Sequence, residues 1–436
     1  MKEFQFRPSF IQIPALGSYE GEIRLPGSKS ITNRAFLIAA LAEGTTHLHN
    51  LLRSDDTCYM GEALQKLGVG IEFSEDYTDA VVHGNGGPIS VSEDAPAELF
   101  LGNAGTAMRS LTAALSLGKG EFHLRGEERM SERPIRDLVD ALRTLDADIK
   151  YLESEGYPPV CIKADGLEGG EVSVRGNISS QYLTALLICA PYCRAPLHIH
   201  VEGELISVPY VQLTLDIMRR FGIDVRHEGM SDFYVPQGVY KAIGDFWVEG
   251  DASSASYPLA AAAIAKGKVR ALGVGSESSQ GDVAFADVLR KMGAKVTIGP
   301  DWIECDGRGC TLHGIDLDLN DIPDAAMTVS VLALFADSPS KIRGIASWRV
   351  KETDRIAAIT AELQKVGAQV TSDMDSVSIV PPAQLQPATI ETYNDHRMAM
   401  CFSLVALGGV PIKIMDPACV NKTYPQYFED FNRLAK

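Results

Sequence analysis

The chain has 436 residues, of which 45% are apolar and 22% charged, a composition that fits large buried cores and excludes a disordered chain or a membrane bundle. Its 57 acidic residues against 40 basic ones leave a formal net charge of −17. Nucleic acid and anionic membranes repel such a chain, so we expect neither as a partner. An anionic ligand would need positive charge concentrated at one place.

The first ten residues carry charges and lack the apolar stretch of a signal peptide. No run approaches the roughly 18 apolar residues that a membrane-spanning helix needs. Eight cysteines in a chain of this length do not indicate a disulfide scaffold. We therefore expect a cytoplasmic protein with reduced thiols.

Six similar units account for the whole chain. Five amphipathic segments end near positions 68, 146, 222, 293 and 367, which are 78, 76, 71 and 74 residues apart, and a sixth ends near position 434. In each unit a short strand leads through a small polar loop to an Ala/Leu-rich helix. A second strand, a charged amphipathic helix and a closing strand follow. This alternation predicts an α/β protein.

Two helices are expected in every unit. The first helices are expected at 31–42, 107–117, 182–190, 255–265, 327–336 and 398–407, and the second at 55–68, 134–145, 208–221, 283–292, 353–366 and 424–434. The segments 23–30 and 246–254 are expected to open units one and four. Six units exceed a usual single core, so we expect two groups of three that divide near 240–246. A solenoid is the alternative, although these units are longer than typical solenoid repeats.

Small polar residues precede the first helix of every unit. Ser, Thr, Asn and Asp cap helix N-termini, whose unpaired N–H groups attract anions. Basic residues gather near these starts, namely Lys29, Arg34, Arg109, Arg133, Lys351, Arg355, Arg397 and Lys422. Solvated surface charge is the alternative for any one of them. The same placement in four units favours a small ligand with several anionic groups.

Two carboxylates and one histidine stand among these cations. Asp324 precedes a helix, Glu352 lies between Lys351 and Arg355, and His396 follows Asn394-Asp395. A carboxylate that moves protons needs neighbours that tune its pKa. The alternatives are a plain N-cap for Asp324, a salt bridge for Glu352 and a helix cap for His396.

Other chemistries find little support. The segment LPGSKS lacks the spacing of a phosphate-binding P-loop, and no G-x-G-x-x-G follows a strand. A zinc site could be proposed at Cys189, Cys193, His198 and His200. The two cysteines lie in an apolar helix, however, which favours a structural role for them. We expect no metal or cofactor.

Several long motifs, in order along the chain from about Gly21 to the C-terminus, resemble the EPSP synthase (3-phosphoshikimate 1-carboxyvinyltransferase) family. They are LPGSKSITNRAFLIAALAEG, GNAGTAMR, ERPI, SSQ at 179–181, EGDASSASY, IPDAAMT, RVKETDR and YNDHRMAMCFSLVAL. The resemblance implies transfer of the enolpyruvyl group of phosphoenolpyruvate to the 5-hydroxyl of shikimate 3-phosphate, in the shikimate pathway to chorismate and the aromatic amino acids. It also implies a monomer without a cofactor.

The implied fold is a two-domain inside-out α/β barrel of six βαβαββ repeats, three in each domain. The domains implied are residues 22–243, and residues 1–21 together with 244–436. The implied shikimate 3-phosphate site comprises Lys29, Ser30, Arg34, Ser179, Ser180, Gln181, Ser207, Tyr210, Asp324, Ser347 and Lys351. The implied phosphoenolpyruvate site comprises Lys29, Asn103, Gly105, Arg133, Gln181, Glu352, Arg355, His396, Arg397 and Lys422.

The implied reaction is an addition followed by an elimination. Asp324 would accept the proton of the 5-hydroxyl as that oxygen attacks C2 of phosphoenolpyruvate. Glu352, with Lys29, would handle the proton at C3, while the cations stabilise the departing phosphate.

This sequence departs from the family pattern at two positions. Ser347 stands where the family commonly has an Asn that touches shikimate 3-phosphate. Ser110 stands where bacterial relatives commonly have Pro. Proline fixes φ and removes a backbone donor, so Ser110 is expected to shift its helix slightly. Changes here are linked in the family to weaker inhibition by glyphosate, and we expect reduced glyphosate sensitivity with phosphoenolpyruvate binding largely kept.

Two rival functions are weighed. UDP-N-acetylglucosamine enolpyruvyl transferases share the fold and the donor, but they carry a reactive Cys in the loop that here spans 120–131 and contains none. Their first motif usually reads G-A-K-N rather than the GSKS found here. A non-enzymatic protein that binds phosphorylated metabolites would need the cations but not Asp324 and Glu352.

Overall fold

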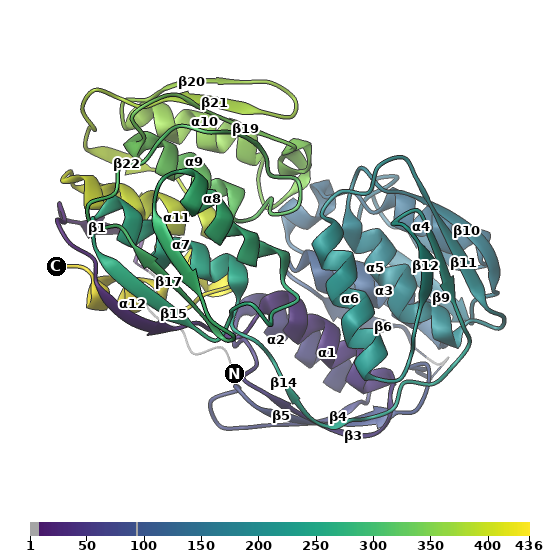
Figure 1. Ribbon diagram of the computed structural model, residues 1–436. Helices are drawn as coiled ribbons and strands as arrows, with labels where there is room; N and C mark the ends of the chain where they lie inside the picture. Colours follow the sequence, from purple (N-terminus) through teal and green to yellow (C-terminus); the bar gives the residue numbers. More distant parts are fainter. Residues whose placement is uncertain (1–7, 93–94) are drawn as a thin grey trace. The chain divides into compact units, whose positions relative to one another are not determined.

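The computed structural model describes residues 8–92 and 95–436 (Figure 1). Its contacts divide the chain into two compact units. The continuous unit comprises residues 27–249, and the split unit comprises residues 1–26 and 250–436. The limits expected from the sequence, 22–243 and the remainder, place both breaks a few residues earlier. Each unit is described by itself.

Each unit holds three repeats with two helices per repeat, at the positions that the sequence predicts. The continuous unit has α1 (Lys29–Leu41), α2 (Asp55–Lys66), α3 (Gly105–Ser116), α4 (Arg136–Thr144), α5 (Ser180–Cys189) and α6 (Val208–Arg220). The split unit has α7 (Ala252–Ile264), α8 (Phe285–Lys291), α9 (Ala326–Leu332), α10 (Arg355–Lys365), α11 (His396–Ser403) and α12 (Tyr427–Leu434). The predicted helices at 327–336 and 398–407 finish as 3-10 turns, Ala333–Phe335 and Leu404–Gly408.

Every repeat forms its own sheet. In the continuous unit the orders are β14-β3-β5-β4, β6-β7-β9-β8 and β10-β11-β13-β12. Their bounds are β3 (Glu43–His49), β4 (Gly70–Phe73), β5 (Ala80–Asn85), β6 (Ala97–Phe100), β7 (Lys119–Arg125), β8 (Asp148–Tyr151), β9 (Val160–Asp165), β10 (Gly170–Arg175), β11 (Leu197–Glu202), β12 (Arg226–Glu228), β13 (Asp232–Val235) and β14 (Gly244–Trp247). The leading strand of each sheet is parallel to the second, and the last two strands are antiparallel.

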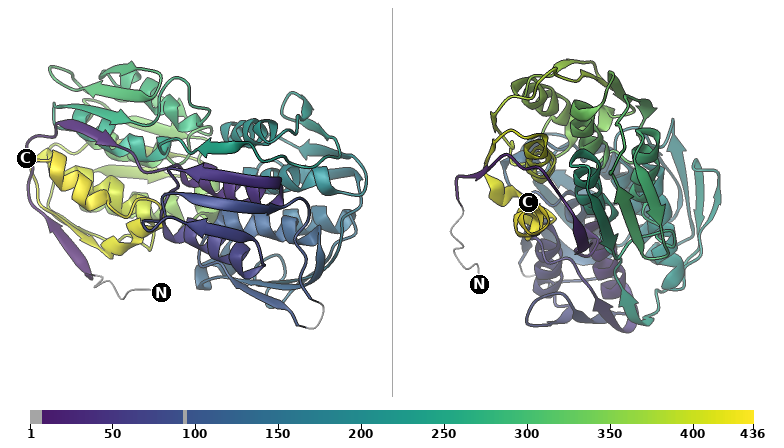
Figure 2. Two further views of the ribbon diagram at one scale, coloured as in Figure 1. Left: turned by 90° about the horizontal axis from the view of Figure 1, so that it is seen from below. Right: turned by 60° about the vertical axis from the view of Figure 1, so that its left-hand side comes forward.

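In the split unit the sheet orders are β16-β17-β15-β2, β18-β19-β21-β20 and β1-β23-β22. The bounds are β1 (Phe10–Ile13), β2 (Gly21–Arg24), β15 (Lys268–Leu272), β16 (Lys295–Ile298), β17 (Trp302–Asp306), β18 (Asp316–Asp318), β19 (Ser340–Arg343), β20 (Gln369–Ser372), β21 (Val377–Val380), β22 (Ala388–Ile390) and β23 (Ile412–Met415). The N-terminal strand β1 runs antiparallel to β23 and so completes the sixth repeat (Figure 2).

The leading strands of repeats one and four are exchanged relative to the sequence prediction. Strand β2 pairs in parallel with β15, with Ile23 opposite Ala271, and β14 pairs in parallel with β3, with Phe246 opposite Leu48. The assignment of these strands to repeats one and four in chain order was therefore wrong. Both are four-residue strands with only one buried residue each, Ile23 and Phe246, so their local sequence does not show which second strand they join.

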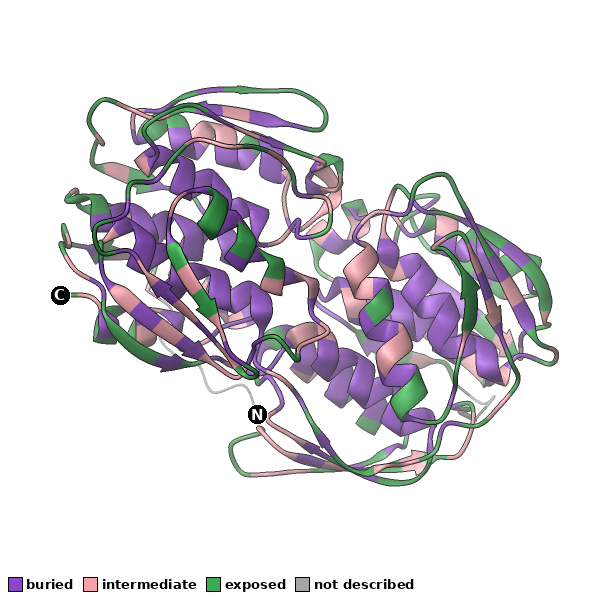
Figure 3. Cartoon of the chain, in the orientation of Figure 1, coloured by how far each residue is buried: buried purple, intermediate pink, exposed green. Residues whose placement is uncertain are grey.

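The first helix of each repeat lies inside its unit, and the sheets lie outside (Figure 3). All 13 residues of α7 are buried, and so is α1 from Ile31 to its end. The strands instead alternate between buried and accessible residues, as in β10 and β11. Helices buried on every side are apolar all round, which is why their sequences read as Ala/Leu-rich. This is the inside-out arrangement expected for the fold.

Five of the second helices end in a left-handed residue, as the sequence periodicity indicates. Gly68, Gly222, Gly293 and Gly367 have φ values of 89°, 91°, 102° and 102°. At the corresponding end of α4 stands Asp146, with φ 72°. Glycine adopts this conformation without steric cost. A residue with a Cβ, such as Asp146, adopts it only at a steric cost.

Candidate active site

The guanidinium of Arg355 lies at the centre of a buried cluster in the split unit. Its Nε donates to Asp395 Oδ2 at 2.7 Å, its Nη1 to Asp324 Oδ1 at 2.8 Å and its Nη2 to Glu352 Oε2 at 2.9 Å. Burial by itself lowers the pKa of Arg355, but Asp395, Glu352 and Asp324 together raise that pKa well above its ordinary value. The guanidinium therefore stays charged and holds three carboxylates at one place.

Arg397 holds the other oxygen of Asp324. Its Nη2 donates to Asp324 Oδ2 at 2.8 Å, and its Nη1 donates to Tyr257 Oη at 3.0 Å. The two oxygens of Asp324 are thus shared between two guanidinium groups, Arg355 and Arg397. The N-cap residue of α9 is Ala325, so Asp324 is not the plain helix cap that the sequence left open. These are charge-assisted hydrogen bonds, the stronger kind.

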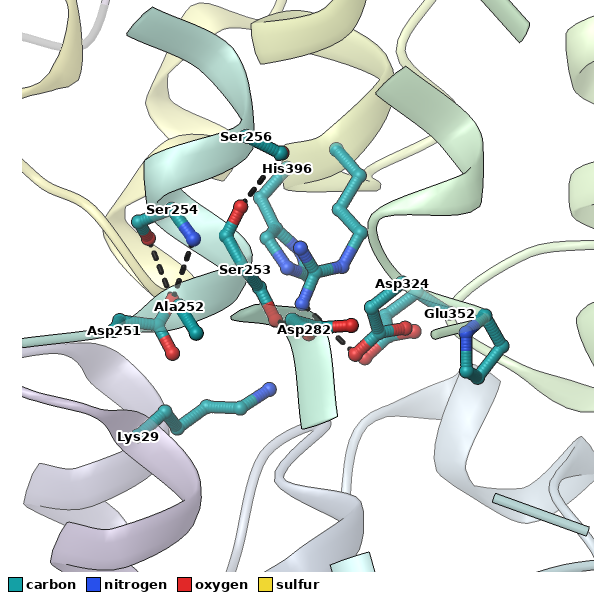
Figure 4. Close-up of polar contacts among 12 residues, drawn as sticks. Lys29, Asp251, Ala252, Ser253, Ser254, Ser256, Asp282, Asp324, Glu352 and His396 are labelled. Atoms are coloured by element: carbon teal, nitrogen blue, oxygen red, sulfur yellow. Dashed lines mark hydrogen bonds and ion pairs between the residues drawn. The ribbon is translucent and has the colours of Figure 1, made fainter. Parts of the chain in front are cut away.

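Glu352, Lys422 and His396 complete the cluster. Lys422 Nζ lies 3.8 Å from Glu352 Oε1, and both side chains are more than nine-tenths buried. His396 is the first residue of α11, fully buried, with Nδ1 3.4 Å from Asp395 Oδ1. Figure 4 shows Asp324 and Glu352 next to each other. The salt bridge to Arg355 that the sequence left open for Glu352 is present. Glu352 also lies beside a second cation, Lys422.

Ser347 and Lys351 flank this cluster in the chain. Both are partly buried, at a 3-10 turn, Ala346–Val350, and just after it. Trp348 in that turn is fully buried, and its Nε1 donates to Pro323 O at 2.7 Å. The turn is therefore fixed to the loop that ends at Asp324. The sequence does not signal this contact.

A fourth acidic group, Asp282, lies beside Asp324 and was missed by the sequence analysis. Asp282 is 5% exposed, and Ser253 Oγ donates to its Oδ2. Burial first, and then the charge of Asp324, raise the pKa of Asp282 to about 7. Figure 4 shows Asp282 between Ser253 and Asp324. Asp282 lies outside every motif considered, so no local signal could have found it.

In the continuous unit, the start of α1 places Lys29, Ser30 and Arg34. Lys29 Nζ lies 3.5 Å from Asp56 Oδ2. Arg34 is buried, and it donates from Nη1 to Ser30 O at 2.9 Å and from Nη2 to Tyr210 O at 3.1 Å. Burial lowers the pKa of Arg34 to about 10. Arg34 therefore fixes the backbone at two of the predicted binding residues, Ser30 and Tyr210.

Two guanidinium groups lie at the start of α3. Arg133 Nη1 donates to Asn103 O at 2.9 Å and to Asn103 Oδ1 at 2.8 Å. A Cβ on Gly105 would lie 2.5 Å from Arg133 Nη2 and 2.7 Å from Arg109 Nη1, so only glycine permits this approach. The N-cap of α3 is Ala104, which makes no side-chain cap. An uncapped helix start beside two arginines is suited to an anion.

The remaining predicted residues of this unit stand at the starts of α5 and α6. The Ser179 hydroxyl accepts from Gln181 N at 3.2 Å and caps α5, of which Ser180 is the first residue. Gln181 Nε2 donates to Thr106 Oγ1 at 3.4 Å, which connects α5 to the start of α3. Ser207 precedes α6 with a left-handed φ of 54°. In the continuous unit the printed contacts thus join Ser30, Arg34 and Tyr210 in one group, and connect Gln181 to the start of α3.

The discarded zinc interpretation finds no support in the structure. Cys189 and Cys193 are buried among apolar residues, whereas His198 Nε2 and His200 Nδ1 lie 3.0 Å and 2.9 Å from Asp232 Oδ1.

Within residues 8–92 and 95–436, no helix combines the length and apolar character needed to cross a bilayer.

Comparison with solved structures defines the class of protein first. The chain superimposes with a TM-score of 0.81 on an EPSP synthase from Acinetobacter baumannii, at 27% identity over 98% of both chains. It superimposes with a TM-score of 0.79 on an enolpyruvyl transferase from Streptomyces tendae, at 17% identity and 98% coverage of both, a likeness of fold alone. The fold is that of the enolpyruvyl transferases.

Sequence comparison then gives the family. Residues 15–431 match the model of EPSP synthase (3-phosphoshikimate 1-carboxyvinyltransferase). A 3-phosphoshikimate 1-carboxyvinyltransferase of Marinomonas sp. is 56% identical over 98% of this chain and 99% of the relative, and one of Sulfurovum sp. is 58% identical over 94% and 95%. The chain belongs to the EPSP synthase family and is an enzyme, a transferase.

Proposed function

We propose that this enzyme transfers the enolpyruvyl group of phosphoenolpyruvate to the 5-hydroxyl of shikimate 3-phosphate and releases phosphate, acting as a cytoplasmic monomer without a cofactor. The names of the relatives support the reaction. The observation that carries the mechanism is Asp324, whose two oxygens are held by Arg355 and Arg397. A base held by two guanidinium groups, whose charge also suits an anionic donor, supports the proposal.

Binding of the donor would change the basicity of Asp324. The carboxylate and phosphate of phosphoenolpyruvate compete with Asp324 for Arg355 and Arg397. A carboxylate that loses charge-assisted hydrogen bonds becomes a stronger base. Asp324 then accepts the 5-hydroxyl proton as the oxygen bonds to C2, and C3 takes up a proton from Glu352, assisted by Lys29. The elimination returns a C3 proton to Glu352 and breaks the bond from C2 to the phosphate oxygen, and the departing phosphate takes up the proton that Asp324 had accepted.

Two sets of residues are proposed to hold the substrates. For shikimate 3-phosphate these are Lys29, Ser30, Ser179, Ser180, Gln181, Ser207, Tyr210, Asp324, Ser347 and Lys351. Arg34 belongs to the same set, and its contacts with Ser30 and Tyr210 favour a positioning role. For phosphoenolpyruvate the set is Lys29, Asn103, Gly105, Arg133, Gln181, Glu352, Arg355, His396, Arg397 and Lys422.

The function is tested by phosphate release from phosphoenolpyruvate with shikimate 3-phosphate, and in parallel with UDP-N-acetylglucosamine. Release is expected with the first acceptor alone. Asp324→Asn and Glu352→Gln are expected to lower kcat by about 10²–10⁴-fold. Asp321→Asn, on the same loop but exposed, serves as the matched control with near-unchanged kcat. Release with the nucleotide sugar alone, or binding without turnover, would contradict the proposal.

Reduced glyphosate sensitivity is a further part of this proposal. Ser110 is buried in α3, whose start carries Gly105. Proline at position 110 would remove a backbone donor and shift the helix. Ser110→Pro is therefore expected to lower the glyphosate inhibition constant while KM for phosphoenolpyruvate changes little. An unchanged inhibition constant would contradict the role given to Ser110.

A further inference from the structure

Three potential metal ligands face the same way on the outer side of the β6-β7-β9-β8 sheet, outside the residues assigned to enolpyruvyl transfer. Glu121 and His123 are two residues apart on β7, so their side chains lie on one face of the sheet. Cys161 on β9 stands directly opposite His123 in the register. A carboxylate oxygen, a ring nitrogen and the sulfur of the three residues all lie within 4.8 Å of one another.

The ring of His123 is oriented by a carboxylate on its other side. Glu98 on β6 is the register partner of His123, and its Oε1 lies 2.6 Å from Nδ1. The opposite nitrogen, Nε2, lies 2.9 Å from Glu121 Oε1. Cys161 Sγ approaches the same oxygen at 3.8 Å. Nε2 and Sγ therefore converge on one region next to Glu121. A histidine whose other nitrogen meets a carboxylate is the usual form of a metal-binding histidine.

We propose that Glu121, His123 and Cys161 bind a zinc ion, with Glu98 as the carboxylate that orients His123. Imidazole nitrogen, thiolate sulfur and carboxylate oxygen are the donors that zinc takes in proteins. Bonds of about 2.0–2.3 Å place the donor atoms of a tetrahedral site roughly 3.5 Å apart. Small side-chain rotations bring the present spacing to that value. Three protein ligands leave the fourth position to water.

The charges around the site suit a divalent cation. Glu121 and the Cys161 thiolate supply two negative charges, and Glu98 supplies a third next to the ring. Lys163 pairs with Glu121 Oε2 at 3.7 Å, which leaves Oε1 for the ion. Zinc replaces the thiol proton of Cys161, so binding releases a proton. The ion joins β7 to β9 and stabilises the folded chain by an amount that rises with the logarithm of the free zinc concentration once that concentration exceeds the dissociation constant.

The first test uses Co²⁺ as a spectroscopic substitute for zinc on the full chain, after removal of bound metal with a chelator. We expect a stoichiometric near-ultraviolet band from thiolate-to-cobalt charge transfer, which zinc abolishes by displacement. Cys161→Ser is expected to remove the band, and His123→Ala to abolish tight binding. Glu98→Gln is expected to weaken binding by about 10–100-fold. Cys58→Ser is the matched control and leaves the band unchanged, because Cys58 lies on α2.

The second test needs no variant. Wild-type protein is alkylated slowly with and without zinc, and the modified cysteines are identified by mass spectrometry of peptides. Zinc is expected to slow alkylation of Cys161 at least tenfold and to leave Cys58 unaffected. The absence of a cobalt band in the wild type, a band that survives Cys161→Ser, or equal alkylation of Cys161 with and without zinc would each overturn the proposal. None of these results depends on enzyme activity.

Discussion

Arg355 Nε donates to Asp395 Oδ2 at 2.7 Å, with 1% of the arginine side chain and none of the aspartate side chain exposed. Oδ1 of the same carboxylate accepts the backbone N of Arg397 at 2.9 Å, at the start of α11. One buried aspartate therefore fixes the central guanidinium and the helix that carries Arg397. Because it binds the guanidinium of Arg355 and the backbone N–H of Arg397, Asp395 positions the candidate active site.

Removal of Asp395 is expected to destabilise the split unit strongly. Asp395→Ala leaves buried positive charge without its nearest partner and removes a helix cap, and we expect a loss of about 3–5 kcal/mol in the free energy of unfolding. Urea unfolding in a Trp247→Phe background, followed through the fluorescence of Trp302 and Trp348, measures this loss. Asp354→Ala is the matched control, because Asp354 caps α10 at a more exposed place and is expected to lose about 1 kcal/mol. Equal losses of unfolding free energy in Asp395→Ala and Asp354→Ala would show that the buried Asp395–Arg355 pair contributes no stability beyond that of a helix cap.

Asp282 is expected to make the stability of the split unit fall as the pH rises. Its pKa is about 7 in the folded chain against an ordinary value of 3.8, so between these values the folded chain binds more protons than the unfolded chain. Stability then decreases with pH by at most roughly 1.4 kcal/mol per pH unit, and the slope ends near pH 7.

Asp282→Asn removes the titrating group, so the pH slope is expected to flatten. The measurement is urea unfolding at pH 5, 6, 7 and 8 in a Trp247→Phe background, in which the remaining Trp302 and Trp348 both report on the split unit. Asp287→Asn, on exposed α8 surface, keeps the wild-type slope. An unchanged slope in Asp282→Asn would assign the pH dependence to another group.

Gly105→Ala is expected to weaken binding of phosphoenolpyruvate selectively. The new Cβ would lie less than 3 Å from the guanidinium nitrogens of Arg133 and Arg109, so both side chains must move. We expect KM for phosphoenolpyruvate to rise about tenfold or more, equivalent to roughly 1.4 kcal/mol, and KM for shikimate 3-phosphate to stay within about twofold. Steady-state kinetics measure both. Gly87→Ala is the control, because a Cβ there meets no atom within 4 Å. Equal increases in both constants would indicate a general disturbance.

Asp146→Gly is expected to stabilise the continuous unit. Asp146 holds φ at 72° at the end of α4, where the equivalent helices end in glycine. Relief of the left-handed strain is worth about 1 kcal/mol, less the entropy that glycine adds to the unfolded chain. Chemical denaturation should therefore show a gain of a few tenths to about 1 kcal/mol. A loss of stability would mean that the Asp146 side chain contributes more than its backbone strain costs.

The helices and their ends could be predicted because their signals are local. Ala/Leu-rich runs predicted the buried first helices, and the spacing of glycines predicted where the second helices end. The exchange of β2 and β14 could not be predicted, because strand pairing depends on which edge is near in space. The same limit applies to Asp282, which lies 42 residues from Asp324 in the chain and beside it in the structure.

The sequence by itself determined the α/β class, the six repeats and the clustering of cations and carboxylates at helix starts, since these depend on periodicity and residue type within short segments. Family motifs added the expected reaction. Only the tertiary structure decided that Asp324 is no helix cap, that Arg355 joins three carboxylates and that two arginines approach Gly105 closely. Apart from the local pairs Arg355–Glu352 and Gly105–Arg109, these are contacts between segments distant in the chain, where burial strengthens each charge interaction and packing selects the partners.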